Sequence, residues 1–294
     1  MLPQLQLLQP TTIAEASQAL GDFGERAKIY AGGAELLLLL RQRLLEAEIL
    51  IDIKKIAGLH EIRADQSGME VGACVTHCAL AGDPSVYRYA PALAYAESQV
   101  ANVRVRHQGT LGGNLCFNDP HSDPGTVLLV HDASVKVANY KGERQLPLAE
   151  FFQGLYATAL RPNEILSAVR IPRLPEGMAS AYLRLHRYQR PTLGVAAAMT
   201  ITDDAIAECR LAVGCAGPKP LRLSQLETKL KGVEASNARR IITEEKSQLR
   251  DLLRPVDDLL GSAEYKLYMT CVMLGDALAQ AAGANGSAAQ EPIV

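Results

Sequence analysis

The sequence has no C-x-x-C pair, no excess of basic residues and no long apolar run, and each absence argues against a class of protein. Its six cysteines match neither iron–sulfur nor zinc spacings, so we expect buried thiols and a reducing cytoplasm. The net charge of −2 provides no basic surface for DNA or RNA. The densest apolar run, residues 36–40, is far shorter than the roughly 20 residues of a membrane span.

Several familiar motifs are also missing. The N-terminal segment lacks the basic start of a secretory signal, since its first basic residue is Arg26. There is no G-x-G-x-x-G fingerprint for a Rossmann dinucleotide site and no G-x-x-x-x-G-K-[ST] phosphate loop. Because no serine–histidine–aspartate or cysteine–histidine pattern is recognisable, we expect neither catalytic residues nor a metal site in this chain.

The length of 294 residues indicates about two domains, at roughly 150 residues per domain, and the hydrophobic share of 48% is enough to bury a sizeable core. The first part predicts a helix over residues 12–20, capped by Thr11 or Thr12, and then a βαβ-like unit of strand 28–30, helix 35–45 and strand 49–53. Further segments are strands 59–64, 69–73, 134–140 and 164–171 and helix 91–100. Residues 104–125 are rich in glycine and proline and are typical of a long functional loop.

A proline and glycine cluster at residues 172–177 indicates a domain boundary. Beyond it, segments 182–190, 194–201 and 207–213 predict an antiparallel sheet with one covered face. The apolar stripe of a later helix contains Tyr265, Tyr268, Met269 and Val272.

Two glycine pairs are the main candidates for function. They lie in residues 31–34 (AGGA), at a strand-to-helix junction, and in residues 109–114 (GTLGGN), within the expected loop. Glycine lets a backbone approach a ligand closely, and the amides at a helix start attract an anion. Each pair is either a tight turn or one side of a grip on a diphosphate, and the residues alone leave both possibilities open.

Other polar residues also allow two interpretations. Asp119 and Asp123 flank a histidine-containing tripeptide and could bind sugar hydroxyls or a metal, or they could anchor a polar loop through Asx turns. His77 is either catalytic or a residue that caps a helix or satisfies a core carbonyl. The basic residues within 184–190 face a phosphate, a partner subunit or solvent.

A family resemblance adds to these observations. Residues 28–36 (KIYAGGAEL) resemble the first flavin-binding motif of the FAD subunits of the xanthine dehydrogenase and carbon monoxide dehydrogenase family of molybdenum hydroxylases. Residues 105–115 (VRHQGTLGGNL), which continue to 119–124 (DPHSDP), resemble the second motif. Segments 71–77 (VGACVTH), 164–172, 194–197 and 261–265 also match, so the resemblance extends over residues 3–280.

The resemblance implies an α+β protein with a vanillyl-alcohol-oxidase-type (PCMH-type) FAD-binding fold. Its FAD-binding domain, residues 1–175, would comprise two α/β subdomains, about 1–57 and 58–175, with FAD between them. A C-terminal domain of the CO dehydrogenase flavoprotein type, residues 176–284, would contain a three-stranded antiparallel sheet with helices. A frayed tail, residues 285–294, would follow.

The resemblance also implies roles for individual residues. Backbone amides of both glycine segments would cradle the diphosphate, Asp123 would bind hydroxyls, and Leu166 would pack beside the flavin. Arg184 stands where the family often has lysine, and Thr192 stands where close relatives have an aromatic residue against the ring. The implied FAD-binding residues are Ile29, Tyr30, Ala31, Gly32, Gly33, Ala34, Glu35, Leu36, Thr110, Leu111, Gly112, Gly113, Asn114, Asp123, Leu166 and Arg184.

The implied function is electron transfer within a molybdopterin-dependent hydroxylase. A small iron–sulfur subunit with 2Fe–2S clusters would donate electrons, and a large subunit would carry the molybdopterin cofactor, in a dimer of heterotrimers. The external acceptor would be NAD, a quinone, ferredoxin or oxygen. Asn114 runs on to Asp119 without the cysteine-rich insertion of one branch of the family, so this chain would carry no cluster. The alternatives are a stand-alone flavin oxidoreductase on the same fold and a non-catalytic adaptor.

Overall fold

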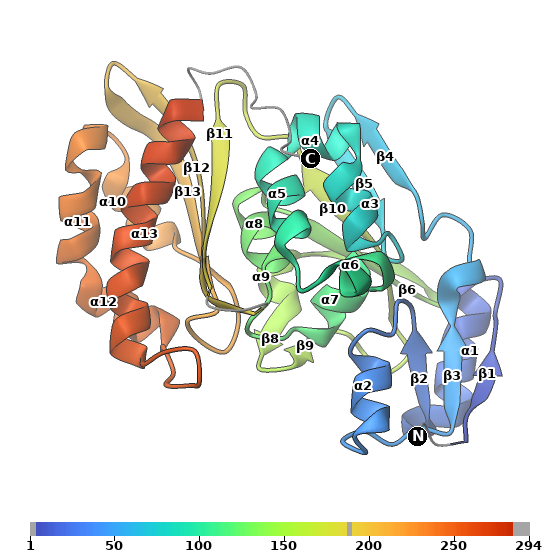
Figure 1. Ribbon diagram of the computed structural model, residues 1–294. Coiled ribbons are helices and arrows are strands. Elements are labelled where there is room, and N and C mark those ends of the chain that lie inside the picture. The colour runs from blue at the N-terminus through green and yellow to red at the C-terminus, as the bar shows by residue number, and fades with distance from the viewer. Residues whose placement is uncertain (1–3, 187–189, 285–294) are drawn as a thin grey trace.

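Three main sheets, each with its own helices, follow one another along the chain (Figure 1). The structure is a computed structural model that describes residues 4–186 and 190–284, so the expected frayed tail lies outside the described residues. Within these ranges, no helix combines the length and the apolar character that crossing a membrane requires.

The N-terminal unit is a small parallel sheet with the strand order β1-β3-β2, formed by Gln6–Leu8 (β1), Ala27–Tyr30 (β2) and Ile49–Asp52 (β3). Helix α1, Ile13–Phe23, begins at the expected cap, where the Thr12 hydroxyl accepts a hydrogen bond from the Glu15 amide at 3.2 Å. Helix α2, Leu36–Arg41, joins β2 to β3 and completes the expected βαβ-like unit. It ends earlier than expected, just before Arg43, which has a left-handed φ of 58°.

The second sheet is antiparallel and has the order β4-β5-β10-β6-β7. Its strands are Ile62–Asp65 (β4), Gly68–Gly72 (β5), Ser134–Asn139 (β6), Gly142–Pro147 (β7) and Ile165–Pro172 (β10). All but β7 were expected from the sequence. Between β7 and β10 lie a short helix and hairpin, Leu148–Phe151 (α9), Phe152–Gly154 (β8) and Ala157–Thr158 (β9).

The expectation of a long loop over residues 104–125 is wrong, because this segment is mostly helical. Along the chain, the helices between β5 and β6 are His77–Gly82 (α3), Pro84–Tyr89 (α4), Pro91–Gln99 (α5), Val103–Gln108 (α6), Leu111–Phe117 (α7) and Pro124–Val130 (α8). Asn102 and Thr110 cap α6 and α7 with side-chain oxygens, and Pro124 occupies the first turn of α8. The glycines and prolines that suggested a loop therefore mark helix starts and close packing.

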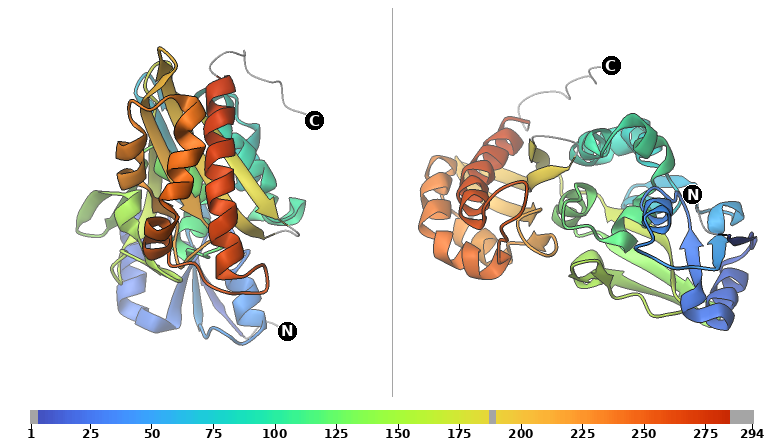
Figure 2. Two further views of the ribbon diagram at one scale, coloured as in Figure 1. Left: turned by 90° about the vertical axis from the view of Figure 1, so that its left-hand side faces the viewer. Right: turned by 60° about the horizontal axis from the view of Figure 1, so that its bottom comes forward.

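The third sheet is antiparallel, with four strands where three were expected. Strands Ala179–His186 (β11), Pro191–Thr202 (β12) and Ala205–Gly214 (β13) are joined by the two-residue strand Leu221–Arg222 (β14). Helices Ser224–Leu230 (α10), Ala238–Glu244 (α11), Lys246–Leu253 (α12) and Ala263–Ala284 (α13) pack on one face (Figures 1 and 2).

Both faces of this sheet are covered, which corrects the expectation of one covered face. Val195 and Met199 of β12 lie in the core beneath helix α13, whereas Ala196 and Ala198 lie in the core shared with the second unit. Helices α5 and α8 contact this second face (Figure 1). Small alanine side chains let these helices approach the strands closely, so the two parts of the chain share one continuous core.

Two arginines of the third sheet form hydrogen bonds with the C-terminal end of α8. Arg222 donates to the Leu129 carbonyl at 3.1 Å and Arg210 donates to the Val130 carbonyl at 3.4 Å. Both arginines also form ion pairs with Asp132. His131 is fully buried at this junction, and its burial, together with the nearby charge of Arg210, lowers the pKa of His131 from 6.5 to about 4.

This buried histidine predicts a loss of stability in mild acid. Below pH 6.5 the unfolded chain binds a proton at residue 131 that the folded chain excludes until the pH approaches 4. The folded state should therefore lose about 2 kcal/mol through this group between neutral pH and pH 5. In His131→Leu this part of the pH dependence should disappear from denaturant unfolding curves, whereas exposed His60→Gln should behave like the wild type. Equal pH profiles for wild type and His131→Leu would contradict the prediction.

Candidate functional site

The two glycine segments meet backbone to backbone. A Cβ atom on Gly32 would lie 2.0 Å from the carbonyl oxygen of Gln108 and 3.0 Å from Cα of Gly109. Gly33 has a φ of +75°, and a Cβ there would lie 2.2 Å from the Tyr30 ring. The first glycine pair is therefore required by the contact between the N-terminal unit and α6, as well as by any ligand.

The second glycine pair lies in the first turn of α7. A Cβ atom on Gly112 would lie 2.6 Å from the Ala73 carbonyl oxygen, so this glycine lets α7 pack against the segment after β5. At Gly113 the nearest atom to a Cβ would be the Thr110 hydroxyl oxygen, at 2.9 Å. Both glycine pairs thus stand next to a helix start, and the second is not part of a loop.

The amides of the two segments differ in what they bind. In the second segment, Leu111 and Gly112 donate to the carbonyls of Val75 and Ala73, at 2.9 and 3.0 Å. Gly113 donates to the Thr110 hydroxyl at 3.1 Å, and Asn114 donates to the Thr110 carbonyl at 2.9 Å.

By contrast, the amides of residues 32–36 have no acceptor anywhere in the described part of the chain. The first segment can therefore donate hydrogen bonds to a ligand, while the second supplies mainly a close, rigid wall.

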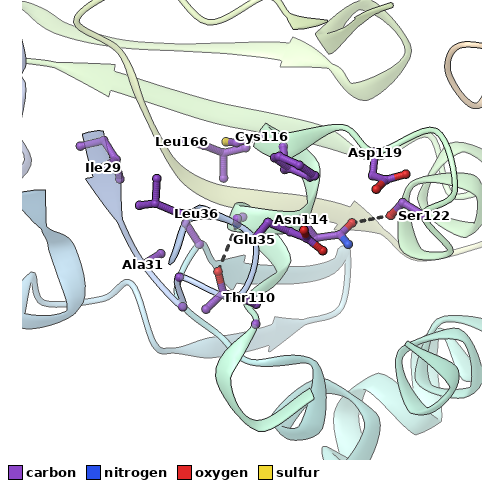
Figure 3. A pocket seen from close by; sticks show the side chains of 18 of the residues that line it. Ile29, Ala31, Glu35, Leu36, Thr110, Asn114, Cys116, Asp119, Ser122 and Leu166 are labelled. Atoms are coloured by element: carbon purple, nitrogen blue, oxygen red, sulfur yellow. Dashed lines mark hydrogen bonds between the residues drawn. The ribbon is translucent and has the colours of Figure 1, made fainter. Parts of the chain in front are cut away.

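A cavity of about 510 Å³ opens between the two segments, within the range of small-molecule and cofactor sites (Figure 3). It brings together thirteen of the sixteen residues expected from the sequence: Ile29, Ala31, Gly32, Gly33, Ala34, Glu35, Leu36, Thr110, Gly112, Gly113, Asn114, Asp123 and Leu166.

Three expected residues do not line this cavity. Tyr30 faces a smaller cavity of about 290 Å³, where the Lys54 ammonium lies 3.6 Å from its ring centroid. Leu111 is fully buried in the core. Arg184 is buried behind the wall, with its Nε 2.8 Å from a carboxylate oxygen of Asp123.

Asp123 connects the cavity to the third sheet. Its Oδ1 accepts hydrogen bonds from the Tyr182 hydroxyl at 2.7 Å and from the Arg184 guanidinium at 2.8 Å, both from β11. Burial, together with the negative charge of Asp123, raises the pKa of Tyr182 well above its ordinary value, so the phenol remains a donor. Arg184 thus fixes the orientation of a cavity residue without reaching the cavity itself.

Hydroxyl, amide and carboxylate groups follow one another along one side of the cavity. The Ser122 hydroxyl donates to the Asn114 side-chain oxygen at 2.7 Å (Figure 3). Asp119 accepts from the His121 amide at 2.9 Å in an Asx turn, one of the alternatives that the sequence left open. The ring of His121 lies 3.1 Å from Asp258, in the segment between α12 and α13, so the C-terminal helices also support this side.

Four residues from separate elements meet at the cavity rim. Arg190, just before β12, lies 2.6 Å from a carboxylate oxygen of Asp119 and 3.6 Å from one of Glu35. Tyr156, from the β8–β9 turn, lines the cavity, and its ring packs against that of Phe117 in a tilted arrangement, with 5.1 Å between the ring centroids. Sequence reasoning missed Tyr156, and only its place in a short hairpin turn could have suggested it.

Two further cavity residues could carry chemistry. Burial raises the pKa of the Cys116 thiol to about 12, which keeps it neutral and unreactive. His77 lines the cavity at the start of α3, and its Nδ1 lies 2.5 Å from a carboxylate oxygen of the buried Glu97. Among the described residues, His77 and Cys116 are not paired with each other as base and nucleophile.

Comparison with known proteins gives consistent matches along the whole chain. Residues 3–174 match the family described as the FAD binding domain in molybdopterin dehydrogenase, and residues 181–281 match the CO dehydrogenase flavoprotein C-terminal domain. The carbon monoxide dehydrogenase medium chain of Hydrogenophaga pseudoflava is 31% identical, over 94% of this chain and 96% of its own. The nicotine 6-hydroxylase medium subunit of Paenarthrobacter nicotinovorans is also 31% identical, over 90% and 93%.

Similarity extends to a xanthine dehydrogenase and to three-dimensional structure. The xanthine dehydrogenase FAD-binding subunit of Escherichia coli O157:H7 is 29% identical, over 95% of this chain and 96% of its own. A solved structure of carbon monoxide dehydrogenase from Hydrogenophaga pseudoflava, in a form lacking the Mo-pyranopterin moiety, superimposes with a TM-score of 0.91. That match covers 97% of this chain and 99% of the other, at 31% identity.

The close contact between the two glycine segments predicts that a methyl group added at Gly32 lowers the stability of the fold. In Gly32→Ala the added carbon would meet the Gln108 carbonyl oxygen at 2.0 Å, so one backbone must move. We expect a loss of about 1–3 kcal/mol in unfolding free energy, measured by denaturant titration. Gly82→Ala in α3 is the matched control, since a Cβ there meets nothing within 4 Å and should change stability by less than about 1 kcal/mol. Equal stability of the two variants would contradict the tight contact.

Proposed function

This chain belongs to the family of FAD-binding subunits of molybdenum hydroxylases, an oxidoreductase family, and from this premise we propose that it binds FAD in the 510 Å³ cavity and relays electrons. The observation that carries the proposal is the row of five amides at residues 32–36, which line the cavity and have no acceptor among residues 4–186 and 190–284. Consecutive backbone amides of this kind form a concave donor set for phosphate oxygens.

The remaining cavity residues fit the other parts of FAD. Ile29, Leu36 and Leu166 provide apolar surface for flat rings. Asn114, Ser122 and Asp123 offer polar atoms to hydroxyl groups of the ribityl chain or ribose. The sixteen residues expected from the sequence remain our proposed binding set, with Tyr30, Leu111 and Arg184 acting through neighbouring wall residues.

The chain's own contribution is to bind and orient the cofactor and to exclude water from it. Bound FAD supplies the redox chemistry and can link one-electron donors to two-electron acceptors. The neutral Cys116 thiol and the absence of a nucleophile–base pair in the described cavity fit a relay that does not transform the organic substrate.

We further propose the assembly that the resemblance implies. A small subunit with 2Fe–2S clusters would donate electrons, a large subunit would carry the molybdopterin cofactor, and two heterotrimers would form the complex. The names of the relatives, medium chain and medium subunit, support a place among other subunits. An external acceptor would complete the reaction, and six free cysteines fit a cytoplasmic location.

The domain organisation that we propose follows the sheets. Their strands lie within residues 6–52, 62–172 and 179–222, which supports subdomains of about 1–57 and 58–175 and a C-terminal domain from residue 176.

The first test is direct binding of the cofactor. Purified full-length chain, reconstituted with FAD, should show the flavin absorption bands and release one FAD per chain on denaturation. A colourless protein that cannot be reconstituted would overturn the proposal and favour the adaptor alternative. Turnover of a small organic substrate by the chain alone would favour the stand-alone oxidoreductase.

The second test concerns the partners. A tagged chain, isolated from its native cells under mild conditions, should elute as a complex that contains iron and molybdenum, measured by size-exclusion chromatography and elemental analysis. The mass of the complex should exceed that of the 31.7 kDa chain several-fold. A metal-free monomer in fresh extracts would contradict the proposed assembly.

A further inference from the structure

A buried histidine lies directly behind the point where the two glycine segments meet. The His77 amide donates to the Gly109 carbonyl at 3.2 Å, and Gly109 is the residue against which Gly32 packs. A Cβ atom on Gly109 would lie 3.0 Å from Cδ2 of His77 and 3.2 Å from its Nε2, so this edge of the ring faces the meeting point. His77 is only 2% exposed, yet it lines the cavity.

The other edge of the ring is fixed by a fully buried carboxylate. Glu97 of α5 is 0% exposed, and its Oε2 lies 2.5 Å from Nδ1 of His77. Its second oxygen, Oε1, has no hydrogen-bond partner among the described residues. A buried carboxylate needs a strong donor, so a proton resides on Nδ1 and Nε2 is the nitrogen next to Gly109.

The charges on the cavity wall indicate a role for the His77–Glu97 pair in binding an anion. Among the described residues, the wall carries four acidic side chains, Glu35, Asp119, Asp123 and Glu164, and besides histidine two basic ones. Of these two, Arg190 is already ion-paired with Asp119 and Glu35, which leaves Lys28. The amides of Gly109 and of residues 111–114 are engaged within the protein, so on that side a diphosphate needs a further donor of positive charge.

We propose that His77 is a diphosphate-recognition residue, an imidazolium that donates from Nε2 to a phosphate oxygen of FAD. Glu97 is its positioning residue, since it binds the opposite nitrogen and compensates the charge. This inference rests on the proposed FAD site and adds to it a residue outside the two glycine motifs. The interaction is a charge-assisted hydrogen bond in a buried setting, which corresponds to a factor of about 10–100 in affinity.

The test compares ligands with and without the diphosphate. The full-length chain, stripped of flavin, is titrated with FAD and with riboflavin, and binding is followed by flavin fluorescence. In His77→Gln the Kd for FAD should rise about 10–100-fold, whereas the Kd for riboflavin should change less than about threefold. Glu97→Gln should weaken FAD binding in the same selective way. His60→Gln, an exposed histidine in the segment before β4 and outside both glycine motifs, should leave both constants unchanged.

Each other outcome has a distinct meaning. An unchanged Kd for FAD in His77→Gln would overturn the role of His77 while leaving the proposed function intact. An equal loss for FAD and riboflavin would overturn it as well, in favour of a packing role. Wild-type chain that fails to bind FAD would remove the proposed function itself.

A second measurement needs no variant of His77. In wild-type chain labelled with ¹⁵N at histidine, the ring nitrogens of His77 should both be protonated when FAD is bound, and the Nε2 signal should shift on adding FAD. The Glu97→Gln variant identifies the resonance, because it changes the partner of Nδ1. A neutral imidazole in the FAD-bound chain, or a signal that FAD does not shift, would overturn the proposal.

Discussion

The contact between Gly32 and the Gln108–Gly109 backbone is the constraint on which the site depends. It joins a parallel βαβ unit to helices of an antiparallel unit at a distance that no side chain could tolerate. Residues on either side of this contact diverge and leave the cavity between them. The required glycines therefore serve the protein's own packing, and the cavity follows from that packing.

The third sheet stabilises this arrangement from the other side. Alanines on one face of β12 let α8 approach closely, and α5 contacts the neighbouring strand β11. Tyr182 and Arg184 of β11 hydrogen-bond to Asp123 at the cavity wall. A buried ion pair with an additional hydroxyl donor has few alternative arrangements, so it fixes the carboxylate in one orientation. The C-terminal part of the chain thus orients the Asp123 carboxylate, although it contributes few residues to the cavity wall.

Much of this could be predicted from the sequence, where the signal is local. The Thr12 cap, the βαβ-like unit and most strands follow from period and capping, and the glycine motifs located the cavity. The expected loop at residues 104–125 was wrong because glycines there permit contact with Ala73, a partner distant in sequence. Tertiary contacts, which no local pattern encodes, also determine three other features. These are the second covered face of the third sheet, the hydrogen-bonded amides near Gly112 and the position of Arg184 behind Asp123.

Hydrogen-bond donors and carboxylates are unevenly distributed over the cavity wall. Backbone amides without an acceptor among the described residues lie at positions 32–36, next to the meeting point of the two segments, whereas Asp119 and Asp123 place carboxylates on another part of the wall. A dianionic group of a ligand is favoured beside the amides and disfavoured beside the carboxylates. In the proposed relay, the task of this site is to align the cofactor between separate redox centres.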